Sequence, residues 1–216
     1  MDFSPEGFPE FFDSAPVVRV RDPLAAFLGA ARDGVLEYRY ADAVKLAGHS
    51  CPTVASAFLM TRAALAALYG KELPQRGGVR VEMSDPAQEG VTGVIANVVS
   101  LLTGVTVDTG FKGLGGRFDR RGLLAYAVDV PGQMRFTRLD TGDSVAVWAQ
   151  LQRVAGDPRI SELMRGCVVG SASEEEQALF RSLWQDRVRR LLCDHADDPE
   201  VLVVAAGQED PIRFQS

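Results

Sequence analysis

A run of apolar residues from position 52 to position 69 gives the strongest structural signal in the chain. Its apolar side chains fall on nearly every face of a helix with about 3.6 residues per turn, which is typical of a helix buried on most sides. Proline is favoured at the first helical position, so Pro52 predicts that the helix begins there and that Cys51 is its N-cap. Gly70 and Pro74 predict that it ends near Tyr69.

Other segments also have helical signals. Residues 23–32 follow Asp22, whose carboxylate suits an N-cap, and residues 91–102 predict another apolar helix. Ser173 and Glu176 form a capping box for a helix that extends to about Cys193. The buried stripe of that helix is predicted to comprise Phe180, Leu183, Trp184, Val188 and Leu191.

Alternating apolar and polar residues predict strands elsewhere. The alternation indicates a strand at 79–83, and the turn residues that follow indicate consecutive antiparallel strands and then a last short strand. These later strands are predicted at 123–130, 134–139, 145–151 and 201–205. Helices and strands arrive in blocks, so the predicted fold class is α+β, an antiparallel sheet packed with several helices.

The two ends of the chain differ from its body. Residues 1–15 form an acidic arm that carries the rings of Phe3, Phe8, Phe11 and Phe12. These rings are a large apolar surface to leave in water, so we expect the arm to dock on the body or on a second copy of the chain. Residues 16–206 are predicted to form a single domain that includes the helix at 173–193, and residues 207–216 a tail.

Composition narrows the function classes. The 216 residues are 46% hydrophobic and 24% charged with a formal net charge of -6, which argues against nucleic acid or an anionic membrane as partner. No stretch approaches the roughly 18 apolar residues of a membrane span, and the start of the chain lacks the basic region of a signal peptide. Three cysteines are too few for a disulfide scaffold, so we expect reduced thiols and a cytoplasmic location.

The candidate chemistry lies directly before the long helix. His49 and Cys51 place an imidazole and a thiol two positions apart, where the free amides and the dipole of the helix favour a thiolate. A thiolate beside an imidazole suits zinc or a similar divalent ion. Asp85, Glu82 or Glu89 could approach from the end of the predicted strand as a third ligand, with water completing the site, and Asp85 could instead act as a base.

Other interpretations of these residues remain open. Cys51 could be a metal-free nucleophile with His49 as its base, or both could be ordinary residues at a helix start. Cys51 before Pro52 also fits a short haem-coordination pattern, in which the thiolate would bind the iron. Cys193 and His195 form a second Cys-x-His pair that could join the first, although nothing in the spacing brings them together.

A glycine-rich loop at 110–116 supplies a candidate ligand contact. Lys112 lies within it and Arg117 follows it, so backbone amides and fixed positive charge could hold a small anionic ligand. The loop lacks the phosphate-binding pattern that ends in Gly-Lys-Ser/Thr, and a tight loop with solvated basic residues explains it as well.

The segment from 48 to 147 resembles the FmdE family, which takes its name from one component of formylmethanofuran dehydrogenase. The resemblance rests on Gly-His-Ser-Cys-Pro at 48–52, on the strand at 79–83 followed by Asp85, and on Thr103-Gly104 at the end of a helix. Two cysteines usual in that family have no counterpart here. The resemblance implies an α+β homodimer with a metal site near His49 and Cys51.

The function that follows from these expectations is metal binding by an enzyme or an accessory factor. The divalent ion, zinc above all, would be held by His49 and Cys51, and the molecule acted on would be a small anion in contact with Lys112 or Arg117. The alternatives are a non-catalytic carrier of metal or haem, and an enzyme that uses Cys51 without a metal.

Overall fold

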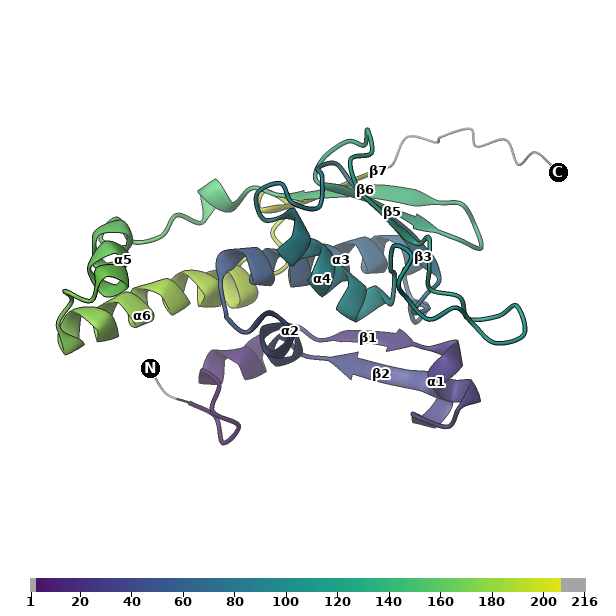
Figure 1. Cartoon of the computed structure of the whole chain (residues 1–216), viewed down its shortest axis with the longest axis horizontal. Helices are drawn as coiled ribbons and strands as arrows, with labels where there is room; N and C mark the ends of the chain where they lie inside the picture. Colours follow the sequence, from purple (N-terminus) through teal and green to yellow (C-terminus); the bar gives the residue numbers. More distant parts are fainter. Residues whose placement is uncertain (1–2, 207–216) are drawn as a thin grey trace.

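Two helices lie between two sheets in the computed structural model, which describes residues 3–206 (Figure 1). A five-stranded sheet in the order β4-β3-β5-β6-β7 covers one side of α3 and α4, and a two-stranded sheet of β1 and β2 lies with α2 on the other (Figure 1). The protein is therefore α+β, with a largely antiparallel sheet packed against helices, as predicted. The predicted tail at 207–216 lies outside the described residues.

The strands and helices have the following bounds. The strands are β1 Val18–Arg21, β2 Val35–Tyr38, β3 Val79–Met83, β4 Leu124–Ala125, β5 Met134–Arg138, β6 Ser144–Ala149 and β7 Leu202–Ala206. The α-helices are α1 Pro23–Phe27, α2 Tyr40–Ala47, α3 Pro52–Tyr69, α4 Thr92–Thr103, α5 Ile160–Val169 and α6 Glu174–Arg189. Among residues 3–206, no helix is both long and apolar enough to cross a membrane.

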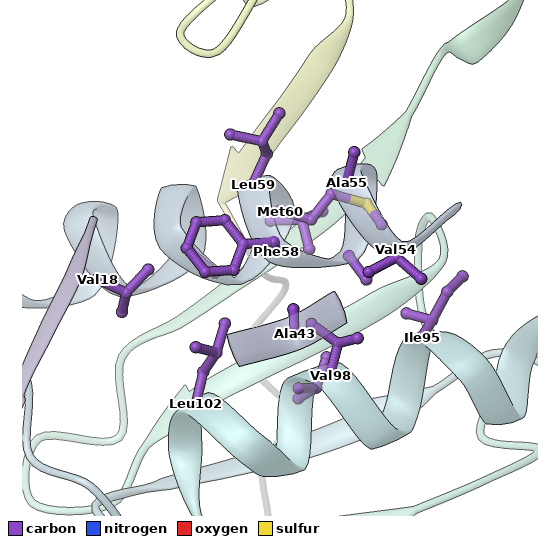
Figure 2. Packing of buried hydrophobic residues seen from close by; sticks show 14 of the residues in the cluster. Val18, Ala43, Val54, Ala55, Phe58, Leu59, Met60, Ile95, Val98 and Leu102 are labelled. Atoms are coloured by element: carbon purple, nitrogen blue, oxygen red, sulfur yellow. The ribbon is translucent and has the colours of Figure 1, made fainter. Parts of the chain in front are cut away.

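Helix α3 forms the centre of the core, as its sequence predicts. Cys51 is its N-cap, Pro52 is its first residue, and most of its side chains are buried. Figure 2 shows Phe58 and Val54 of α3 beside residues of α4 such as Val98. Fully burying an apolar side chain of this size stabilises the folded state by about 1.5–3 kcal/mol. This packing holds the start of α3 in a fixed place.

Two predicted elements differ from the structure. The strand expected at 123–130 is only β4, Leu124–Ala125, and it runs parallel to β3 instead of pairing with β5. The chain leaves strand geometry at Ala127, whose φ of 55° lies in the left-handed region. The helix expected at 23–32 begins after Asp22 as predicted but ends at Phe27. Strand β1 and helix α5 had no counterpart in the sequence-based prediction.

The N-terminal arm and the last helices meet on one side of the body. Phe12 is 5% exposed and its ring centroid lies 4.8 Å from that of Tyr40 in α2.

The predicted capping box of α6 is confirmed, since the Ser173 hydroxyl accepts from the Glu176 amide (3.2 Å) and the Glu176 carboxylate accepts from the Ser173 amide (2.8 Å). Helices α5 and α6 form a hairpin that projects beyond the rest of the chain (Figure 1).

Candidate functional site

A short loop between α2 and α3 carries His49, Ser50 and Cys51. Gly48 ends α2 in the left-handed conformation, with φ at 74°, and its amide donates to the Val44 carbonyl (2.8 Å). A residue with a side chain would cost about 1–2 kcal/mol in this conformation, so glycine suits the position. The turn at Gly48 brings the His49–Cys51 segment against the start of α3.

The Cys51 sulfur lies at the N-terminus of α3. It accepts a hydrogen bond from the Val54 amide at 3.4 Å, and the residue is 8% exposed. An amide donor and the positive end of the helix dipole both stabilise negative charge on the sulfur. The position is therefore chemically suited to a metal-binding or nucleophilic thiolate, although little of the side chain reaches solvent.

The His49 ring is exposed and has a defined orientation. Its Nδ1 lies 2.9 Å from the Ala47 carbonyl oxygen. A carbonyl oxygen only accepts, so Nδ1 carries the proton and donates it, which leaves the Nε2 lone pair of the neutral ring available. Histidines that bind metals commonly donate their second ring nitrogen to a carbonyl in this way. Within residues 3–206, Nε2 has no hydrogen-bond partner.

Helix α6 holds the loop through Ser50. The Ser50 hydroxyl donates to Oε1 of Gln185 at 3.0 Å, so the Tyr40 hydroxyl, also 3.0 Å away, donates to the Ser50 oxygen. The Ser50 carbonyl accepts from Nε1 of Trp184 (2.9 Å) and from Nε2 of Gln185 (3.3 Å). Burial raises the pKa of Tyr40 far above its usual range, so its hydroxyl keeps its proton as a donor. These bonds fix the backbone between His49 and Cys51.

The carboxylates expected beside His49 and Cys51 do not form a metal-binding group with them among residues 3–206. Asp85 and Glu89 are exposed, and Glu82 is paired with Arg135 at 2.8 Å. In the part of the chain that the structure describes, no group of three or more His, Cys, Asp or Glu side chains could hold a metal ion. Among residues 3–206, His49 and Cys51 therefore remain as two candidate ligands, and water, a small ligand or a second copy of the chain could complete a metal site there.

Cys193 and His195, the second Cys-x-His pair, each contact a residue outside the proposed metal site. Nδ1 of His195 lies 2.9 Å from the Asp198 carboxylate, which accepts a hydrogen bond from it and whose pKa is lowered by that bond. The Cys193 sulfur lies 3.8 Å from the Phe11 carbonyl, and burial raises the pKa of its thiol. The neutral thiol is therefore the favoured form of Cys193.

The glycine-rich loop closes on itself. Leu114 and Arg117 exchange backbone hydrogen bonds of 2.9 and 3.0 Å, and a side chain at Gly113 would overlap the Arg117 carbonyl. The Arg117 guanidinium lies over the Phe118 ring, 4.8 Å from its centroid, and Lys112 is exposed. Contact of Lys112 or Arg117 with an anion stays a prediction.

A cavity next to the loop that carries His49, Ser50 and Cys51 was not predicted from the sequence. It has a volume of about 430 Å³ and lies between the N-terminal arm and α6, with Ser50 in its wall. The aromatic arm and the apolar stripe of α6 were both visible in the sequence, but their meeting depends on contacts between residues far apart in the chain.

Comparison with known proteins adds no identification: no family model matches the chain, and no curated protein matches it. The resemblance to the FmdE family therefore rests on its motif residues alone.

Proposed function

We propose that this chain is an FmdE-like metal-binding protein in which His49 and Cys51 hold a divalent ion and act with it on a small anionic molecule. The observation that carries the proposal is the hydrogen bond from Nδ1 of His49 to the Ala47 carbonyl at 2.9 Å. It orients the ring and leaves Nε2 as the electron-pair donor, which is how protein scaffolds prepare a histidine ligand.

The second proposed ligand is the Cys51 sulfur at the N-terminus of α3, where the Val54 amide supports negative charge. Imidazole and thiolate together favour zinc. Zinc takes four ligands, so a site with only two from the chain keeps positions for water or for the molecule acted on. A bound ion would act as a Lewis acid toward that molecule. Asp85 as a base, acting through a bound water, and Lys112 and Arg117 as anion contacts belong to the same proposal.

Zinc content tests this proposal. Wild-type protein equilibrated with zinc and passed through a desalting column should retain stoichiometric zinc by elemental analysis. Cys51→Ser and His49→Ala should each lose it, and serine keeps the helix cap, so the fold should survive. Cys193→Ser and His195→Ala are matched controls from the second Cys-x-His pair and should retain zinc. Full zinc in both Cys51→Ser and His49→Ala would refute the metal site.

A metal-free Cys51 nucleophile is the second candidate, because the free Nε2 of His49 suits a general base as well as a ligand. Under this alternative, iodoacetamide should alkylate Cys51 at the same rate with and without chelator. Under the metal proposal, zinc should protect Cys51 and a chelator should restore alkylation. Haem binding at Cys51 rests only on the Cys-Pro dipeptide, and no contact among residues 3–206 favours haem over zinc.

We also propose that the chain is a homodimer formed through the α5–α6 hairpin. Val168 and Val169 at the end of α5 are 79% and 75% exposed, and Leu179 of α6 is 37% exposed. The hairpin projects from the body of the protein (Figure 1), and exposed apolar side chains in such a position are typical of an interface between chains. Val168→Glu should give a monomer in size-exclusion chromatography with light scattering, whereas Ser161→Glu on the same helix should leave the dimer intact. A monomeric wild type would refute the proposal.

We also propose a reducing, cytoplasmic location, because three cysteines are free thiols: Cys51, Cys167 and Cys193.

A further inference from the structure

The cavity between the N-terminal arm and α6 has the dimensions and lining of a small-molecule site. Its volume is about 430 Å³, within the roughly 300–1,000 Å³ typical of ligand pockets. Phe8 and Phe12 of the arm form one wall, and Phe180 and Trp184 of α6 form the other. Aromatic walls on two sides favour a planar apolar ligand, because rings stack or meet edge to face.

The polar side chains that line this cavity differ in whether they already have a hydrogen-bond partner. Ser50 and Gln185 form a 3.0 Å hydrogen bond with each other, so a ligand need not supply a polar group for either of them. Arg181, by contrast, is exposed, and among residues 3–206 its guanidinium forms no ion pair or hydrogen bond. An unpaired guanidinium beside an aromatic cavity attracts a carboxylate, sulfonate or phosphate, which it can bind through two parallel hydrogen bonds.

The arm is placed so that it forms one side of the cavity. A bridge between Phe3 and Pro9 and a hydrogen bond from the Ser4 amide to the Phe8 carbonyl (2.7 Å) fold it into a turn. Phe12 anchors it in the core, whereas Phe3 is 59% exposed at the rim. An aromatic ring that remains exposed at the rim of an aromatic cavity has apolar surface left for a ligand to cover.

We infer that this cavity binds a small aromatic anion, with the ring between the arm and Trp184 and the negative group on Arg181. The inference does not rest on the proposed metal site, since neither His49 nor Cys51 lines the cavity. It assigns a recognition role to the Phe-rich arm and to α6, which also holds the His49–Cys51 loop through Ser50.

Two naphthalene probes of nearly equal size separate the aromatic contribution from the charge. Titration of 2-naphthoate into the full chain should quench Trp184 fluorescence, and calorimetry should give saturable binding. The neutral 2-naphthalenemethanol should bind more weakly. Arg181→Gln should weaken naphthoate binding roughly tenfold, because glutamine removes the positive charge and can keep only one of the two hydrogen bonds, and it should leave naphthalenemethanol binding unchanged. Arg165→Gln on α5, which does not line this cavity, is the matched control and should change neither affinity.

Several results would overturn the inference. The inference fails if neither probe binds saturably. It also fails if Arg181→Gln weakens the binding of both probes equally. Loss of the fluorescence change in Trp184→Phe, with binding retained by calorimetry, is the expected result, and a full response in that variant would place the ligand elsewhere. His49→Ala and Cys51→Ser should bind naphthoate like wild type. If they lose it while Arg181→Gln does not, the anion binds at the metal site, and the inference fails while the proposed function stands.

Discussion

Asp22 is the residue at which electrostatics makes the clearest quantitative prediction. The residue is 4% exposed, and its carboxylate accepts from Arg120 at 2.8 Å and from Arg76 at 3.0 Å. It also caps α1 by accepting from the Leu24 amide at 2.9 Å. One carboxylate thus forms ion pairs with two guanidinium groups and connects the start of α1 to distant segments of the chain.

Asp22→Asn removes the charge and keeps a capping oxygen. The variant leaves Arg120, which is 5% exposed, without its counter-ion, and breaking a buried pair in this way costs about 3–5 kcal/mol of unfolding free energy. Asp22→Ala should cost about 1 kcal/mol more, because it also removes the cap. The control is Glu37→Gln, which breaks an exposed 3.1 Å pair with Arg39 and should cost less than about 1 kcal/mol.

Urea unfolding followed by circular dichroism, at neutral and acidic pH, measures these differences. Burial raises the pKa of Asp22, but the ion pairs with Arg120 and Arg76 outweigh it and hold the pKa below its ordinary value of 3.8. A carboxyl group with a lowered folded pKa stabilises the protein above its unfolded pKa, and this stability is lost as pH falls. The gap between wild type and Asp22→Asn should therefore narrow below about pH 4. A cost under about 1 kcal/mol at pH 7, or a gap that does not narrow, would refute the reasoning.

Three further substitutions test other parts of the fold by urea unfolding. Gly77→Ala should cost at least about 1–2 kcal/mol, since φ is 76° and the new methyl group would overlap the Arg120 guanidinium; an unchanged midpoint would contradict this placement of Arg120. Ser173→Ala should lose about 1 kcal/mol with the capping box of α6, and no loss would mean that the cap is unimportant. Phe12→Ala should cost about 3–5 kcal/mol because its ring is buried against Tyr40, and a cost near zero would mean that the arm is not docked.

Local chemistry made much of this structure predictable. The N-cap at Cys51, the first turn at Pro52 and the capping box at Ser173 depend on a few neighbouring residues, so the sequence alone places them. The same holds for helix α3, because its apolar residues fall on nearly every face and predict burial on most sides.

The arrangement of the site depended on contacts that no local pattern encodes. Ser50 is held by Gln185, 135 residues away, and the cavity joins an arm at one end of the chain to a helix near the other. Glu82 was a candidate ligand from its position beside the strand end, but it faces Arg135 across the sheet. Strand β4 was misjudged for a similar reason, because its apolar residues do not reveal which edge of the sheet it joins.

The most direct test of the central claim is the near-ultraviolet spectrum of the protein loaded with cobalt(II), which reports a metal–thiolate bond by its charge-transfer band. If Cys51 and His49 are ligands, the band should appear in wild type and in Cys193→Ser and disappear in Cys51→Ser. Absence of the band in wild type, or its loss in Cys193→Ser with retention in Cys51→Ser, would contradict a metal site at the start of α3.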